Sequence, residues 1–502
     1  MVKRHLVTVL FLIVGLQLKL REQVYMRPAV SVALFILAVS TPVQAQTVAP
    51  DAKIDADGWT IFTPSADTRI VYVSSSTGND IYSGALQDKP VKTIAKGISR
   101  LRNGYPDWLL LKKGDTWYES IGWPNLSGRS ASNPILLSSY GTGPRPVIKS
   151  GGKSGFAATG SRGIKAINNI SLVGLDFYAQ TRDPSSPEFA GVAGATGISW
   201  IINAANILIE DCVVRYYRNN IVMGEGPLVL SNVSLRRNII VDAYSTDSHS
   251  QGLYADGINT LMLEGNVFDH NGWNASIRGA EPTVFNHNVY IQITNGPATL
   301  TKNILANASS HGAQVRSGGT VSNNLFVHNP IGLLIGHSAS TVSNNVVTEG
   351  GDIGPGDQRG FGIDVNPTVN GSVKVVNNVI AHEASGSPYG HGIHLAQDTD
   401  SFTATNNLIY HWDHPIVDYG THNVTTQNSI DLNGYPDPDR SVATYNAMLG
   451  GDRSLAGFLE EVRKQSKDNW RPRFSADAVN DYLRAGFGIV SSADPNIGET
   501  TK

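Results

Sequence analysis

Side chains that could transfer protons or bind anions gather between residues 269 and 316. The histidines are also concentrated in this part of the chain, because 12 of the 13 lie between His249 and His422. A neutral imidazole can accept a proton near pH 7, and a guanidinium can form paired hydrogen bonds to a carboxylate or sulfate. The candidate catalytic residues are Arg278, His287, Tyr290, His311 and Arg316. The candidate substrate-binding residues are Asp269, His270, Trp273, Asn288 and Gln314.

The two arginines favour a polyanionic substrate. Arg278 and Arg316 each end a short, largely apolar segment of the sequence. We expect the two arginines at the same position of a repeated strand, on nearby coils. A pair of guanidiniums at that spacing suits a chain of carboxylates. The alternative is that each arginine pairs with a nearby Asp or Glu on the surface, where ion pairs are common and weak.

A uronic-acid polymer would be cleaved by β-elimination with this set of residues. The reaction needs the carboxylate neutralised, the C5 proton removed and the leaving glycosidic oxygen protonated. Arg278 or Arg316, with Gln314 or Asn288, would neutralise the carboxylate. His287 or His311 would be the base, and Tyr290 would be the acid.

The metal requirement stays open. Asp256, Asp269 and Asp364 are candidate calcium ligands, because carboxylates are the oxygen ligands that Ca²⁺ prefers. No compact calcium-binding motif occurs in the sequence, and none of the proposed chemistry requires a cofactor.

A recurring asparagine indicates the elements that position these residues. It lies at a bend and is followed by two or three apolar residues, at steps of about 21 residues stretched by insertions. Short strands repeated at this period cannot close a core alone, so they must stack on their neighbours as a solenoid. The ladder positions are Asn238, Asn266, Asn288, Asn303, Asn324, Asn345, Asn378, Asn407 and Asn428.

This pattern resembles the right-handed parallel β-helix of the pectate-lyase-like superfamily. The resemblance implies an all-β fold, a right-handed parallel β-helix solenoid with an N-terminal cap and a C-terminal helical cap or tail. We expect the N-terminal cap at 46–129, the β-helix at 130–435 and the helical segment at 436–502. It also implies a carbohydrate-active enzyme, and a polysaccharide lyase fits the candidate residues best.

Three alternatives to a lyase stay open. Hydrolases of this fold that cleave polygalacturonate carry Asn-Thr-Asp, Asp-Asp and Gly-His-Gly, of which only Gly390-His391-Gly392 occurs here. C5-epimerases of alginate carry Asp-Pro-His-Asp, which is missing. A non-catalytic polysaccharide-binding solenoid would use aromatic side chains to stack on sugars. The aromatic candidates are Trp273, Tyr290, Phe361, Tyr389 and Trp412.

Residues 1–45 predict export. The stretch from Met26 combines Arg27, an apolar run and the small-residue pattern ending at Ala45, which is typical of a secretory signal cleaved after Ala45. The true start is then Met26 or Met1. We expect a secreted or periplasmic monomer with no stable membrane span in the mature chain. The net charge of −3 gives no general attraction to nucleic acid, so an acidic polysaccharide is the expected partner.

Overall fold

The computed structural model describes residues 53–159, 166–336, 339–350, 360–366, 372–383, 390–396, 401–419 and 423–490. The predicted leader, residues 1–45, and the aromatic candidate Tyr389 lie outside these ranges. Within the described residues, no helix has the length and apolar character needed to cross a membrane.

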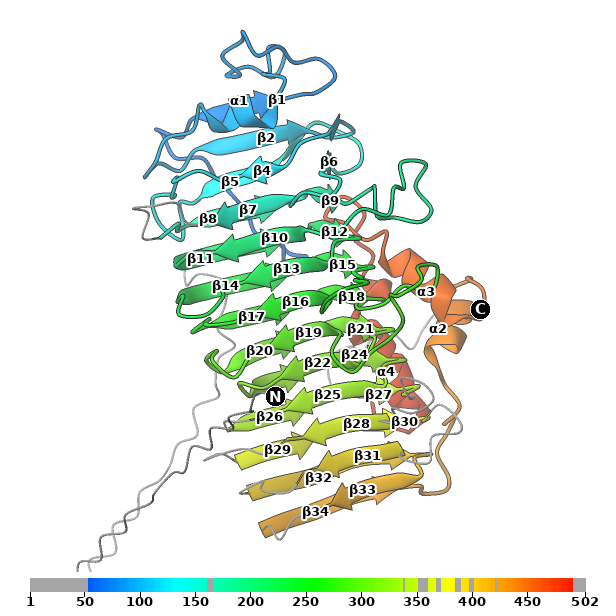
Figure 1. Ribbon diagram of the computed structural model, residues 1–502. Helices are drawn as coiled ribbons and strands as arrows, with labels where there is room; N and C mark the ends of the chain where they lie inside the picture. Colours follow the sequence, from blue (N-terminus) through cyan, green and yellow to red (C-terminus); the bar gives the residue numbers. More distant parts are fainter. Residues whose placement is uncertain are drawn as a thin grey trace, which may run out of the picture. The chain divides into compact units, whose positions relative to one another are not determined.

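The chain winds through repeated coils whose strands stack in parallel in three columns, which confirms the predicted β-helix (Figure 1). The first column contains β1 (Ile70–Val73), β2 (Trp108–Lys112), β5 (Ile135–Tyr140), β8 (Ile170–Val173), β11 (Ala204–Glu210), β14 (Leu230–Arg236), β17 (Leu261–Glu264), β20 (Ala298–Thr301), β23 (Gly319–Ser322), β26 (Ser340–Ser343), β29 (Ser372–Val376), β32 (Ser401–Tyr410) and β34 (Asn423–Ile430). The second contains β3 (Thr116–Trp117), β6 (Val147–Lys149), β9 (Asp176–Tyr178), β12 (Val213–Arg215), β15 (Ile239–Val241), β18 (Val267–Asp269), β21 (Ile304–Ala306), β24 (Leu325–Val327), β27 (Val346–Thr348) and β30 (Val379–Ala381). The third contains β4 (Ile121–Gly122), β7 (Phe156–Thr159), β10 (Thr196–Ile201), β13 (Asn219–Met223), β16 (Gln251–Ala255), β19 (His287–Ile291), β22 (His311–Val315), β25 (Ile331–Ile335), β28 (Gly360–Val365), β31 (Gly390–Leu395) and β33 (His414–Asp418).

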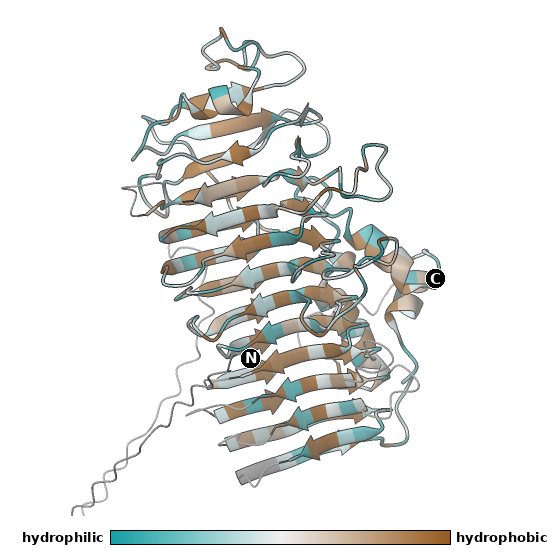
Figure 2. Cartoon of the chain, in the orientation of Figure 1, coloured by the Kyte–Doolittle hydropathy of each residue, from teal (hydrophilic) through white to brown (hydrophobic). Residues whose placement is uncertain are grey.

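Alternation along each strand of the third column separates the core from the surface. Leu253, Val289, Ala313 and Leu333 face each other in register on successive coils and are fully buried. Because strand side chains alternate, the residues that follow them, such as Tyr290 and Gln314, point outward. Figure 2 shows hydrophobic residues along the stacked strands, as expected when each coil buries its apolar side against the next.

Buried asparagines form the predicted ladder between the first and second columns. In one example, the side-chain amide of Asn303 donates to the Asn324 carbonyl oxygen at 2.9 Å, and Asn324 donates to Asn345 at the same distance. The ladder runs on through Asn378 and Asn407. The left-handed backbone lies one residue earlier, for example at Asn323 with φ 58°. The ladder asparagine therefore supplies hydrogen bonds, while its predecessor makes the bend.

Asn288 is the exception to the predicted ladder. Asn266 donates directly to Asn303 at 3.0 Å, which leaves Asn288 out of that series. It belongs instead to a second buried ladder, in which Asn220 donates to Asn271 and Asn271 donates to Asn288 at 2.8 Å. The phrase around Asn288 is thus a strand of the third column, β19, and not a bend.

The stack begins inside the segment predicted as an N-terminal cap, 46–129. β1 pairs with β2, and β2 pairs with β5, so coiling starts at Ile70 and not at residue 130. Helix α1 (Ile94–Ile98) lies between these strands in the chain and buries Ile94 and Ile98 in the same core. The ladder asparagine starts later in the chain, which is why the sequence placed the boundary late.

The C-terminal segment is helical as predicted, but it packs along the second column and does not close the end of the stack (Figure 1). Phe458, Leu459 and Leu483 share a cluster with Ile304 and Leu325. From β15 to β30 the strands of this column are buried at every position, so they have an apolar outer face that a helix must cover. The elements are α2 (Val442–Met448), α3 (Leu455–Val462), the 3-10 helix η1 (Pro472–Phe474) and α4 (Ala476–Gly486).

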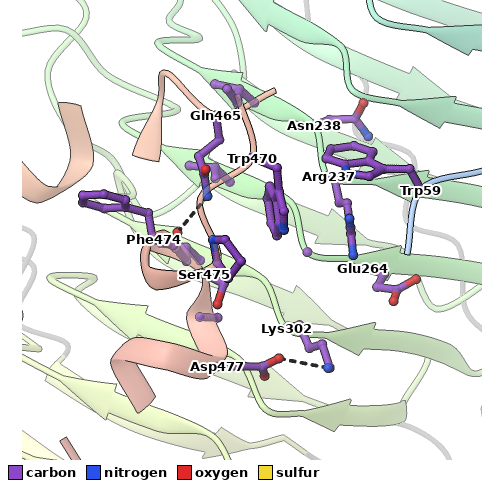
Figure 3. A pocket seen from close by; sticks show the side chains of 16 residues that line it. Trp59, Arg237, Asn238, Glu264, Lys302, Gln465, Trp470, Phe474, Ser475 and Asp477 are labelled. Atoms are coloured by element: carbon purple, nitrogen blue, oxygen red, sulfur yellow. Dashed lines mark hydrogen bonds and ion pairs between the residues drawn. The ribbon is translucent and has the colours of Figure 1, made fainter. Parts of the chain in front are cut away.

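A small cavity of about 190 Å³ marks where the N-terminal and C-terminal segments meet the coils (Figure 3). The Arg237 guanidinium carbon lies 4.5 Å from the Trp59 ring centre and 4.7 Å from that of Trp470. Lys302 pairs with Asp477 at 2.9 Å beside them. Cation–π contacts and an ion pair therefore tie both terminal segments to the stack.

Candidate functional site

The candidate site is a groove of about 680 Å³ on the outer face of the third column. It crosses the strands, from the loop before β16 to His394 in β31. A groove in this direction presents one strand after another to a bound polymer. Its lining residues are His249, Val284, Phe285, His287, Tyr290, Ile293, His311, Gln314, Arg316, Ile331, Leu334, Gly336, Phe361, Asp364, Asn366 and His394.

Strand register brings five of the predicted residues together here. His287 of β19 is in register with His311 of β22, and Tyr290 is in register with Gln314. Arg316 follows β22 directly, and its backbone N–H donates to Ile291. Because parallel strands lie about 4.8 Å apart, residues distant in sequence become neighbours on one face.

His287 and His311 form a buried imidazole pair. Their Nδ1 atoms are 3.0 Å apart, and the Ser310 hydroxyl lies 2.9 Å from the same nitrogen of His311. Both rings are about 3% exposed. In a neutral pair, the Nδ1–H of one ring donates a hydrogen bond to Nδ1 of the other. The donor ring then has a lone pair on Nε2, and its partner has an N–H on Nε2. The pair therefore offers a base and a hydrogen-bond donor side by side.

Tyr290 lies between this pair and a positive charge. Its ring packs edge-on against His287, with ring centres 5.2 Å apart, and the Arg316 guanidinium carbon is 5.2 Å from the Tyr290 ring centre. The Gln314 side chain is 5% exposed, and its amide oxygen is buried without a hydrogen-bond partner. An unpaired buried amide oxygen is costly, so it marks a position where a ligand donor would be stabilising.

Burial keeps His287 neutral. Desolvation is the main cause that lowers the pKa of His287 well below 6.5, and nearby His311, Arg316 and His249 lower it further. Burial likewise lowers the pKa of His391, in β31, to about 4, with His394 and His414 adding to the effect. His287 is therefore an unprotonated base throughout the neutral range.

These depressed values predict a loss of stability in mild acid. Below pH 6.5 an unfolded histidine takes up a proton while folded His287 and His391 do not, so the free energy of unfolding falls as pH drops. Each such histidine contributes about 1.4 kcal/mol per pH unit between pH 6.5 and its folded pKa. Chemical denaturation at several pH values between 6.5 and 5 would measure the slope. His391→Asn should remove the contribution of that histidine and so make the slope smaller. Equal slopes for wild type and His391→Asn would contradict the assignment.

Arg278 does not share a column with Arg316, contrary to the sequence prediction. It is exposed on the loop between β18 and β19, whereas the strand in register with β22 is β19. The loop sequence mimics the apolar phrase of a strand, and the true strand comes nine residues later. Asn288, the other displaced candidate on this side, points into the core, where it is fully buried in the second ladder and donates to the Ala306 carbonyl.

Asp269, His270 and Trp273 lie at the second column, away from the groove. Arg463 Nε donates to Asp269 at 2.7 Å, and the His270 ring nitrogen lies 2.9 Å from Asp242. Trp273 packs against His270 and donates to a backbone carbonyl. These three predicted substrate-binding residues are thus structural, because they hold a turn and the C-terminal segment.

The three candidate calcium ligands do not converge. Asp269 pairs with Arg463, Asp364 pairs with His394, and Asp256 lies beside Thr294 at the end of β16. Asp256 and Asp364 are separated by four strand steps, roughly 19 Å. Across the part of the chain that the structure describes, no three His, Cys, Asp or Glu side chains are grouped to hold a metal ion.

Sequence reasoning named Phe361 as an aromatic candidate and Asp364 as a candidate calcium ligand. It missed His249, Phe285 and His394, and it did not place any of these residues at the ends of the groove. At one end His249 stacks on Phe285, with ring centres 5.5 Å apart. At the other, His394 pairs with Asp364 and stacks on Phe361. Aligning the third-column phrases by their inward apolar residues would have placed Asp364 and His394 in the Tyr290 row, since each follows an inward isoleucine.

A match to a protein-family model supports the fold. The model of the right-handed β-helix region matches residues 188–347. No curated protein matches the sequence. Among solved structures, XylC in complex with xylose is 12% identical with a TM-score of 0.47, over 74% of this chain and 87% of that one. Pectate lyase Pel9A is 13% identical with a TM-score of 0.39, over 82% and 89%. The GH136 lacto-N-biosidase from Eubacterium ramulus is 14% identical with a TM-score of 0.37, over 72% and 68%.

Proposed function

We propose that the groove is the active site of a polysaccharide lyase that cleaves an acidic polysaccharide by β-elimination. The observation that carries the proposal is the buried His287–His311 pair, whose His287 ring burial keeps neutral, lying beside Tyr290 and the Arg316 guanidinium. These groups supply a base, an acid and a positive charge within one wall of a groove that crosses the strands.

The reaction then proceeds as follows. Arg316 and the Gln314 amide N–H groups hold the uronate carboxylate, which stabilises the negative charge that develops when C5 loses its proton. The unprotonated ring of the histidine pair takes the C5 proton, and the electron pair of the broken C5–H bond forms the C4–C5 double bond. The C4–O4 bond breaks, and the Tyr290 hydroxyl protonates the departing oxygen. No water is consumed.

Hydrolysis is supported less well by the groove. Hydrolysis of a glycosidic bond ordinarily uses two carboxyl groups that flank it. Of the described residues that line the groove, only Asp364 carries a carboxyl group, and it is bound to His394. Epimerisation shares the C5 proton abstraction and differs in the return of a proton to the other face of the sugar.

Removing the charge from the substrate, or from Arg316, tests the role of the carboxylate. Wild-type protein should cleave a polyuronate and leave its carboxyl-reduced counterpart intact. Arg316→Gln should lower kcat/KM on the polyuronate by about 10²-fold or more. Arg278→Gln is the matched control, because it removes an exposed arginine outside the groove, and it should retain wild-type activity. Equal cleavage of both polymers would contradict the proposal.

A further inference from the structure

The groove has a second polar end, separate from the histidine pair. It is formed by Asp364 and Phe361 of β28 and His394 of β31, and the ring of Tyr419, which follows β33, lies next to His394 beyond the groove lining. Asp364 is in register with His394, and both lie in the same row as Tyr290 and Gln314. β31 is three strand steps from β22, which is roughly 14 Å at the usual spacing.

His394 is held in place from three directions. Its Nδ1 lies 2.7 Å from Asp364 Oδ1, its ring stacks on Phe361 with centres 4.4 Å apart and an interplanar angle of 9°, and the Tyr419 ring lies 5.5 Å away. Asn366 in turn donates to the other Asp364 oxygen at 3.3 Å. Because the Asp364 carboxylate accepts the hydrogen bond from Nδ1–H, Nε2 is the nitrogen left for a ligand.

The surfaces around His394 suit a sugar ring. Tyr419 is 62% exposed, which is unusual for a large aromatic side chain in a folded protein. Aromatic faces with a few fixed polar groups are the typical lining of a small-molecule site. Between the two polar ends, β25 contributes Ile331 and Leu334, which cannot transfer protons.

We infer that this end is a sugar-binding subsite for the same polymer chain, about three sugar units from the histidine pair. Phe361 and Tyr419 would stack on a sugar ring, His394 would hydrogen-bond to it, and Asp364 would act as a positioning residue through His394. The inference rests on the proposed function, because it describes how one acidic chain occupies the whole groove. A pyranose unit repeats along an extended chain at nearly the strand spacing, so successive units match successive coils.

Chain length tests the subsite. Calorimetric titration with oligouronates, from the disaccharide to the hexasaccharide, should show that affinity for wild-type protein rises about tenfold once the chain spans both ends, or about 1.4 kcal/mol. Phe361→Ala and His394→Gln should lose that gain and keep wild-type affinity and turnover for the disaccharide. His328→Asn, at an exposed turn outside the groove, is the matched control and should keep the gain.

The positioning role of Asp364 is tested by comparing the hexasaccharide affinity of single and double variants. Asp364→Asn should lose the same hexasaccharide affinity as His394→Gln, and the double variant should lose no more than either, since both changes remove one interaction. A hexasaccharide gain that survives Phe361→Ala and His394→Gln, with normal disaccharide turnover, would overturn the subsite and leave the proposed function standing. Failure of wild-type protein to bind any oligouronate would overturn both.

Discussion

Tyr290→Phe should lower kcat on a polyuronate by about 10²- to 10⁴-fold, because a positioned general acid contributes that much to a proton-transfer step. The substitution removes the hydroxyl alone. The ring keeps its edge contact with His287 and its position beside Arg316, so KM should change little. A loss confined to kcat would assign the hydroxyl to the transition state. Steady-state kinetics on a soluble polyuronate would measure it.

Tyr254 provides the matched control. It occupies the same row one coil earlier, in register with Tyr290, and the two rings pack edge to face with centres 5.6 Å apart. Tyr254→Phe therefore makes the same chemical change at the same strand position outside the groove lining. It should retain wild-type kcat. Equal losses in both variants would indicate a structural effect and contradict the assignment of Tyr290 as acid.

Arg463→Ala should destabilise the fold by about 3 kcal/mol, the lower end of the cost of removing one partner from a buried ion pair. Arg463 follows α3 and bonds to two carboxylates at once, Asp242 at 2.8 Å and Asp269 at 2.7 Å. Both carboxylates are nearly buried, at 8% and 3% exposure. The neighbouring arginine also holds the pKa of Asp242 below its usual value, although hydrogen bonding to His270 contributes more and burial opposes both. Without Arg463, two carboxylates remain in the interior with one cation fewer, and the C-terminal segment loses its attachment to the second column.

Chemical denaturation at pH 7 would measure this loss. Lys464→Ala is the control, because Lys464 is the next residue in the chain, is half exposed and pairs only with Glu460 and Glu461 among the described ion pairs. Exposed pairs of this kind contribute little, so its cost should stay below about 1 kcal/mol. A loss for Arg463→Ala no larger than that would show that the helices stay docked through apolar contacts alone.

Most of the fold could be predicted from the sequence, because the repeated asparagine has a structural role in every coil. The ladder asparagines must recur once per coil to hydrogen-bond to one another, so their spacing reports the coil directly. The packing of the C-terminal helices was less accessible. The apolar faces of these helices indicate that they pack against the stack. Their position depends on the apolar outer face of the second column, and a sequence such as Leu325–Val327 does not show that its strand has such an outer face.

The site was harder to predict, because it depends on register between coils with insertions of different length. His287, Tyr290, His311, Gln314 and Arg316 were found because they lie close in sequence. His394 lies in the same row as Tyr290 but four coils further on, and only strand pairing brings it into the groove.

The structural role of His270 could have been predicted from its position relative to the ladder. It follows the ladder residue Asn266 by four positions, as His328 follows Asn324 and as His382 follows Asn378. All three histidines have positive φ, at 56°, 53° and 58°. That offset marks a turn in the left-handed region, which histidine tolerates better than most residues, and it separates His270 from the groove residues without any structure.

The chemistry of the cleaved bond tests the central proposal most directly. Purified wild-type protein would be incubated with a polyuronate while ultraviolet absorbance and new reducing ends are recorded together. β-Elimination predicts one absorbing C4–C5 double bond for each new reducing end, and loss of both signals in Tyr290→Phe. New reducing ends without absorbance would indicate hydrolysis. Solvent deuterium entering C5 without chain cleavage would indicate epimerisation, and either result would contradict the lyase assignment.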